Sequence, residues 1–135
     1  NKNSRVILTA INNGAVPDLP ADVAVEVSAC VGSEGAKPIA FGKLPMAERG
    51  WLQIMKAMEP VTEEAAVTGG CIKALTAFIL NPQVPSGASA KRVLDELLIA
   101  HEKYLPQFAY VNGRLKEEGV EIKDEKVRAL MKQSL

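Results

Sequence analysis

The sequence predicts an α+β fold in which a small, mainly antiparallel or mixed sheet is followed by a helical C-terminal half. Two observations support this prediction. In the first third of the chain, apolar residues alternate or form short runs between turn residues, which is typical of strands. From Met46 onward they recur at spacings of three and four residues, which is typical of amphipathic helices. Because the strands precede the helices, we expect the helices to pack on one side of the sheet.

The composition argues against several classes of partner. The 135 residues include 16 basic and 16 acidic side chains, so the chain has no net field that would attract a nucleic acid or an anionic membrane. No apolar run approaches the roughly 20 residues that cross a bilayer. Cys30 and Cys71 lack metal-binding spacing and indicate reduced thiols in a cytoplasmic protein. The chain has no initiating Met, and we expect it to be part of a longer protein.

Three strands are expected in the first part of the chain, and the second and third of them form a hairpin. Residues Arg5–Ile11 are apolar on both alternating faces, which predicts a buried central strand covered on both sides. Residues Val23–Val31 alternate, with valines and Ala29 on one face and Glu26 among small residues on the other. Gly32–Gly35 then forms a turn, and Lys37–Phe41 returns as a short strand, with a hairpin loop longer than the tightest type.

Helical periodicity fills the middle of the chain. A first helix begins at Met46, and Pro60 is expected to kink or restart it before Gly69-Gly70 ends it. Cys71–Leu80 forms the next helix, and Ser86–Ser89 caps a further one that Pro106 closes. The residues predicted to line the apolar faces of these helices are Met46, Trp51, Met55 and Met58, then Ile72, Leu75, Phe78 and Ile79, and then Ala90, Val93, Leu94, Leu97, Leu98, His101, Tyr104 and Leu105.

The apolar pattern weakens after Phe108. We therefore divide the chain into a domain of residues 1–108 and a charged C-terminal tail of residues 109–135. Val120 and Ile122 suggest an extended piece in this tail, and Asp124–Leu135 a short helix.

The polar residues that most resemble a binding site follow the first strand. Asn12 and Asn13 come directly after it, and their amides could reach sugar hydroxyls or a phosphate, or could serve the turn itself, because Asn bonds its own backbone and tolerates positive φ. Glu26 could line a pocket or lie on a solvated face of the sheet. The residues alone leave both alternatives open.

A catalytic constellation is not visible in the sequence. His101 is the only histidine and has no second metal ligand at helical spacing, so we expect it to pack in the core. Neither cysteine has a neighbouring base that would mark a nucleophile. The ten glycines never form a nucleotide-binding loop.

Several separated motifs nevertheless resemble the C-terminal region of glycoside hydrolase family 4, in particular the 6-phospho-β-glucosidases within it. The similarity covers roughly Val6 to Phe108. Its motifs, in order, are Asn12-Asn13-Gly14-Ala15-Val16-Pro17-Asp18-Leu19-Pro20, Val25-Glu26-Val27, Lys43-Leu44-Pro45, Glu59 with Glu64-Ala65-Ala66, and Tyr104-Leu105-Pro106-Gln107-Phe108. The tail after Phe108 and Pro60 depart from the family pattern.

This resemblance implies a fold similar to the C-terminal domain of lactate and malate dehydrogenases. It also implies NAD and a divalent metal, most often manganese, held by an N-terminal domain, and a redox-elimination mechanism in place of paired carboxylates. In that mechanism hydride leaves C3 of the sugar, a base takes the C2 proton, the aglycone is eliminated, water adds and hydride returns. The family's metal ligands, base and nucleotide loop find no matching motif in this chain.

The resemblance therefore implies the C-terminal domain of a cytoplasmic, homo-oligomeric 6-phospho-β-glucosidase, inactive without its N-terminal domain. In that context Asn12, Asn13 and Glu26 become candidate components of a sugar-phosphate pocket, and no catalytic, metal or cofactor-binding residue is expected in this chain. Two alternatives stay open. One is a non-catalytic assembly or regulatory domain, and the other is the same family acting on an α-galactoside, an α-glucuronide or a 6-phospho-α-glucoside.

Overall fold

The computed structural model describes residues 4–123, 125 and 128–129. The chain forms two compact units, residues 1–56 and residues 57–135. Strands belong to the first unit and most of the helical structure to the second, which confirms the predicted α+β class. Among the helices of the described residues, none combines the length and apolarity that crossing a membrane requires.

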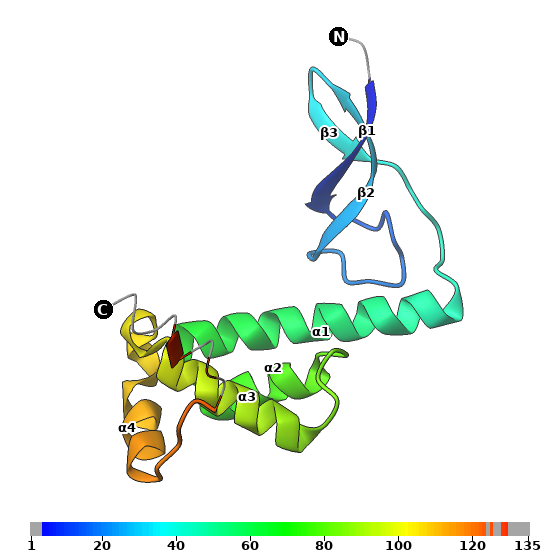
Figure 1. The fold of residues 1–135 in the computed structure, drawn as a ribbon. Helices are drawn as coiled ribbons and strands as arrows, with labels where there is room; N and C mark the ends of the chain where they lie inside the picture. Colours follow the sequence, from blue (N-terminus) through cyan, green and yellow to red (C-terminus); the bar gives the residue numbers. More distant parts are fainter. Residues whose placement is uncertain (1–3, 124, 126–127, 130–135) are drawn as a thin grey trace. The chain divides into compact units, whose positions relative to one another are not determined.

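The first unit is built on an antiparallel sheet. Its strands are β1 (Ser4–Ile11), β2 (Ala24–Gly32) and β3 (Gly35–Pro38), in the order β1-β2-β3 (Figure 1). The expected alternation of β2 is confirmed, because Val25, Val27 and Ala29 are buried and Glu26 is exposed. The central strand of the sheet is therefore β2, which pairs with both neighbours.

The prediction that the first strand is central and covered on both sides is wrong for this chain. β1 lies at the edge of the sheet, and Val6, Ile7 and Ile11 are 41%, 70% and 58% exposed. An apolar run indicates that both faces of a strand can be covered by other residues. It does not indicate whether those covering residues lie in this chain. No described residue covers these side chains to the extent that the sequence suggested.

The hairpin between β2 and β3 is also tighter than expected. Gly32 pairs with Gly35, so only Ser33 and Glu34 form the loop. Such two-residue loops favour residues that accept positive φ near the turn, and Gly35 has φ +92°. The ladder continues beyond β3, since the Ile39 N–H donates to the Ser28 carbonyl at 2.8 Å.

The loop that joins β1 to β2 is organised by one buried amide. Asn12 is fully buried, and its Nδ2 lies 3.0 Å from the Val16 carbonyl oxygen, 3.0 Å from that of Leu19 and 2.9 Å from that of Pro20. Its Oδ1 accepts the Val16 N–H at 2.7 Å. One side chain thereby satisfies backbone groups that neither strand can reach, which is why the loop can fold inward instead of spreading into solvent.

Asn13 and Gly14 make the turn that begins this loop. Both have positive φ, 43° and 82°, the region that Asn and Gly tolerate best. The Ala15 N–H closes the turn by donating to the Asn12 carbonyl at 2.8 Å. The predicted turn at these residues is therefore confirmed.

Inside the first unit, this loop packs against the sheet. Val16 and Leu19 from the loop form a buried cluster with Val25 and Val27 of β2. Asp18 fixes the loop from the other side, because its Oδ2 accepts the Leu44 N–H at 2.7 Å. These contacts connect a Pro-rich surface segment to the core of the unit.

Helix α1 (Met46–Thr68) begins in the first unit and ends in the second. It runs through Pro60 as one element, so the predicted restart at this position is wrong. Proline removes one backbone donor and disfavours a helix, but the neighbouring turns tolerate the loss here. The expectation that Met46 and Trp51 are core residues also fails, since they are 81% and 59% exposed, while Met55 and Met58 are half-buried.

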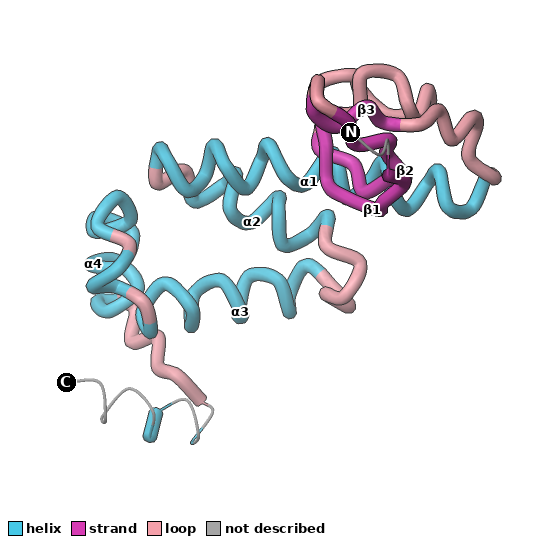
Figure 2. Tube along the Cα trace, turned by 90° about the horizontal axis from the view of Figure 1, so that it is seen from above, coloured by secondary structure: helices cyan, strands magenta, loops and turns pink. Residues whose placement is uncertain are grey.

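The second unit contains α2 (Cys71–Leu80), α3 (Gly87–Ala100), two short 3-10 turns (Glu102–Tyr104 and Pro106–Phe108) and α4 (Ala109–Glu117). Figure 2 shows α2 and α3 side by side, and α4 near the C-terminal end of α3. The predicted Ser86 cap is confirmed, because its side chain accepts the Ser89 N–H. The buried core of this unit comprises Ala65, Ala74, Leu94, Leu98, Phe108 and Leu115.

Two predictions about faces in this unit are wrong. Ile72 and Ile79 of α2 are 82% and 54% exposed, while the small residues Ala74 and Ala77 are buried. Alanine lets neighbouring helices approach closely, so the larger isoleucines lie outside the contact. His101 is exposed and forms the C-cap of α3, where the helix ends five residues before Pro106 and turns away from the core.

The expected charged tail begins with an ordered helix. α4 follows Phe108 directly, and its Asn112 and Leu115 are 0% and 4% exposed. Ile122 is also buried, at 6% exposure. Residues 109–123 therefore contribute buried side chains to the second unit, whereas most of the short helix predicted for 124–135 lies outside the described residues. The proposed boundary at residue 108 stays a prediction.

We predict that Asn12→Ala lowers the free energy of unfolding by about 2–4 kcal/mol, because buried backbone groups left without a partner cost about 1–3 kcal/mol each. Urea denaturation measures this change. Asn13→Gly is the matched control, since glycine accepts the positive φ and the side chain is exposed. Equal effects of the two substitutions would contradict the role assigned to the Asn12 amide.

A second prediction concerns Gly69, which ends α1 with φ +71°. A Cβ at this position would lie 2.0 Å from the carbonyl oxygen of Gln107. We expect Gly69→Ala to destabilise the protein by at least about 2 kcal/mol, because the backbone must shift. Gly50→Ala, inside α1 with no atom near its Cβ, should stabilise it by about 0.5–1 kcal/mol in the same thermal unfolding assay. A harmless Gly69→Ala would show that the two segments do not approach this closely.

Candidate functional site

The candidate site in the first unit is a cavity of about 290 Å³. It lies where the loop after β1, strand β2 and the start of α1 meet. Its lining is mainly apolar and includes two charged side chains. The lining residues are Val16, Leu19, Ala24, Val25, Glu26, Val27, Phe41, Leu44, Leu52 and Lys56.

The buried amide of Asn12 determines one wall of this cavity. Val16 and Leu19 line it, and the Asn12 Nδ2 donates hydrogen bonds to the carbonyl oxygens of both residues. The Asn12 side chain itself is fully buried behind them and uses its donors and acceptor within the loop. Its geometry suits a positioning residue, which shapes the wall without facing the space.

The three candidate residues named from the sequence are thus separated by the structure. Glu26 lines the cavity from β2. Asn12 lies behind the cavity wall, and Asn13 lies in the exposed turn and is not among the lining residues. Whether any of them contacts a sugar phosphate stays a prediction, and of the three only Glu26 is among the residues that line the cavity.

The cavity offers two kinds of chemistry. The Glu26 carboxylate can accept hydrogen bonds from hydroxyl groups, and the Lys56 ammonium can approach an anion. The lining around them is mainly apolar, and Glu26 itself remains exposed to solvent. Lys56 comes from α1, and the sequence did not indicate a role for it in binding. The fold brings it to the same cavity as Glu26.

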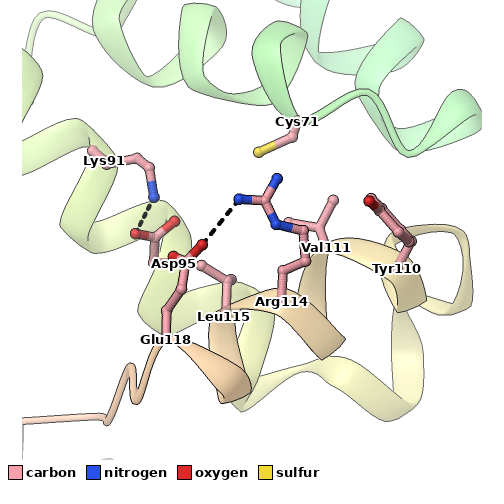
Figure 3. A pocket seen from close by; sticks show the side chains of 8 residues that line it. All are labelled: Cys71, Lys91, Asp95, Tyr110, Val111, Arg114, Leu115 and Glu118. Carbon is pink, nitrogen blue, oxygen red and sulfur yellow. Dashed lines mark hydrogen bonds and ion pairs between the residues drawn. The ribbon is translucent and has the colours of Figure 1, made fainter.

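A second cavity, of about 220 Å³, lies within the second unit. Figure 3 shows that its charges form two pairs: the Lys91 ammonium points to Asp95, and the Arg114 guanidinium binds Glu118 at 3.0 Å. Cys71, Tyr110, Val111 and Leu115 complete the lining. Because each charge already has an opposite charge beside it, this cavity suits a structural role better than the recognition of a charged ligand.

Asp95 of α3 is only 8% exposed, and its Oδ1 has no hydrogen-bond partner among the described residues. The i,i+4 spacing to Lys91 is the sequence feature that could have indicated a paired carboxylate. Asn112 of α4 is fully buried with neither polar side-chain atom bonded in the described part of the chain.

The described residues offer no cluster that fits a metal ion. Within residues 4–123, 125 and 128–129, no three His, Cys, Asp or Glu side chains come together as a metal ion would require. Cys30 lies on β2, Cys71 begins α2 and His101 caps α3, so the three are distributed over separate elements. The glycines form no loop of the dinucleotide-binding type.

Comparison with known proteins gives the same family throughout. The sequence model described as "Family 4 glycosyl hydrolase C-terminal domain" matches residues 1–84. A probable 6-phospho-beta-glucosidase from Bacillus subtilis is 52% identical over 101 residues, which cover 75% of this chain and 23% of that protein. A maltose-6'-phosphate glucosidase from Fusobacterium mortiferum is 32% identical over 106 residues, covering 78% and 24%.

Solved structures support the same assignment. A 6-phospho-alpha-glucosidase from gut microorganisms, in complex with NAD and glucose-6-phosphate, matches with a TM-score of 0.73 and 34% identity, over 78% of this chain and 24% of that one. The 6-phospho-beta glucosidase of Thermotoga maritima, with manganese, NAD+ and glucose-6-phosphate, matches with a TM-score of 0.71 and 28% identity, over 78% and 26%.

This chain spans about a quarter of the length of the relatives that it matches. The resemblance found in the separated sequence motifs is confirmed by the family match, which covers more than half of the chain, and by the relatives. The chain belongs to the family 4 glycosyl hydrolases and matches the C-terminal domain of that family.

Proposed function

We propose that this chain is the C-terminal domain of an NAD- and metal-dependent 6-phospho-β-glucosidase that hydrolyses 6-phospho-β-glucosides by redox elimination. One observation carries the choice of the β-anomer. The relative from Bacillus subtilis named a probable 6-phospho-beta-glucosidase is 52% identical, whereas the maltose-6'-phosphate and 6-phospho-alpha-glucosidases described above are 32–34% identical. In this proposal the enzyme is cytoplasmic and homo-oligomeric.

The cofactor, metal and catalytic residues belong, in this proposal, to the rest of the polypeptide. Among the described residues, the His, Cys, Asp and Glu side chains form no group that could hold a metal ion, which supports that division. We therefore assign this chain a binding and structural role, without catalytic activity of its own.

Within that role we propose that Glu26 accepts hydrogen bonds from hydroxyl groups of the phosphosugar. Its position in a largely apolar cavity supports this role. Asn12 contributes as a positioning residue, because it holds the loop that carries Val16 and Leu19. Asn13 contributes by forming the turn that begins this loop, and it does not line the cavity.

A second candidate is a 6-phospho-α-glucosidase. It is favoured by the number of relatives with that activity in their names, among them proteins from Leptotrichia buccalis and Clostridium acetobutylicum at 34% and 32% identity. A 6-phospho-beta-glucosidase from Escherichia coli is also 34% identical, so identity at this level does not separate the anomers. The larger similarity to the Bacillus subtilis protein supports the β-anomer in this proposal.

We predict that the full-length enzyme, supplied with NAD and Mn²⁺, turns over a 6-phospho-β-glucoside with a kcat/KM at least about 100-fold above that for maltose 6'-phosphate, a difference of about 2.7 kcal/mol in the barrier. Release of the aglycone from both substrates, and from an α-galactoside and an α-glucuronide, measures this preference. A preference for maltose 6'-phosphate would establish the second candidate. Absence of turnover on all four substrates would favour a non-catalytic assembly domain.

A further prediction concerns Glu26. We expect Glu26→Ala in the full-length enzyme to lower kcat/KM roughly 10- to 100-fold, because a hydrogen bond to a charged group contributes about 1.5–3 kcal/mol. Glu34→Ala is the control, since Glu34 lies in the exposed hairpin turn, paired with Lys37. If both variants kept wild-type kinetics, Glu26 would be a solvated residue of the sheet with no part in binding.

A further inference from the structure

The outer edge of β1 carries a regular row of backbone groups that the described chain does not use. The direction of these groups follows from the register of the sheet. Gly32 and Gly35 close a two-residue turn, and the Ser28 carbonyl accepts the Ile39 N–H on the β3 side. The backbone N–H and C=O groups of the even-numbered residues of β2 therefore point toward β3. The N–H and C=O groups of its odd-numbered residues then point toward β1.

The pairing between β1 and β2 extends this rule to the edge. Val27 pairs with Leu8 and Ala29 with Val6, so the even-numbered residues of β1 bond inward to β2. The Asn12 N–H, which donates to the Val23 carbonyl at 2.9 Å, continues the same alternation. The N–H and C=O groups of Arg5, Ile7, Thr9 and Ile11 therefore point to the outer edge.

This edge lacks the features that normally keep an edge strand unpaired. Natural edge strands are short, bulged or interrupted by proline and charge. β1 has eight residues in unbroken one-to-one register with β2, with Arg5 as its only charged side chain and no proline. On the face opposite the core, Ile7 and Ile11 are 70% and 58% exposed. A strand that is apolar on both faces is typical of the interior of a sheet.

The partner strand is not found in the described part of this chain. After β3 the described elements are helices, and the three strands are already accounted for within the sheet. The matched relatives, by contrast, are about four times as long as the segment that this chain represents. A strand of the same polypeptide also has an advantage over a second copy, because its linkage gives it a high effective concentration.

We infer that a strand from the part of the enzyme outside this chain pairs with the outer edge of β1, which makes β1 an interior strand of a larger sheet. This inference rests on the proposed function, because it requires the chain to be part of a longer enzyme. The pairing gives partners to the backbone groups of Arg5, Ile7, Thr9 and Ile11. It also places apolar neighbours beside Ile7 and Ile11.

Residue-resolved hydrogen exchange on the active full-length enzyme tests this inference. The two sets of amides in β1 serve as mutual controls, since they differ only in the side to which they point. We expect the outward amides of Ile7 and Thr9 to exchange within about tenfold of the inward amides of Val6 and Leu8, because both sets are then hydrogen-bonded. Outward amides that exchange at least about 100-fold faster than the inward ones would overturn the inference.

Two further readouts separate the remaining explanations. If protection of Ile7 and Thr9 is lost on dilution below the concentration at which the oligomer dissociates, the partner is a second copy and the inference is wrong. Protection that persists in the dissociated enzyme supports a strand of the same polypeptide. Activity measured on the same sample keeps the two proposals apart, because an active phosphoglucosidase with fast outward amides contradicts the strand pairing alone.

Discussion

The structure of the first unit depends on one buried side chain. The Asn12 amide holds the carbonyl groups of Val16, Leu19 and Pro20 together and accepts the Val16 N–H. Without these bonds, a loop containing two prolines would have to leave its polar backbone in solvent. With them it folds inward, gives Val16 and Leu19 to the apolar cluster on β2, and forms one wall of the cavity that Glu26 lines. Loop, core and candidate site are therefore consequences of the same constraint.

Local features of this fold could be predicted from the sequence, whereas contacts between distant segments could not. The Asn13-Gly14 turn and the Ser86 cap were predictable because each is determined by neighbouring residues. The buried face of α2 was not predictable, because it depends on how closely a partner helix approaches. The side chains of Ala74 and Ile72 do not determine that distance. α4 was missed because its sequence has low apolar content, and its burial depends on Leu115 meeting the core of the second unit.

The candidate site could be predicted only in part. Glu26 was identifiable as an isolated carboxylate in an apolar strand, but its neighbour Lys56 comes from a helix thirty residues later and was not. For Asn12 the sequence left a role in the turn and a role in binding open, and the structure shows its side chain fully buried with hydrogen bonds to the loop backbone. The chain spans about a quarter of the length of its relatives, and Glu26 and Lys56 line a cavity within that part.

A crystal structure of the full-length enzyme with bound glucose 6-phosphate is the most direct test of this account. The account predicts that the Asn12 amide keeps its bonds to Val16, Leu19 and Pro20 in the complex, and that the Glu26 carboxylate lies within hydrogen-bonding distance of a sugar hydroxyl. A complex in which the Asn12 amide leaves the loop to bind the sugar, or in which the sugar lies far from both Glu26 and the loop, would contradict it.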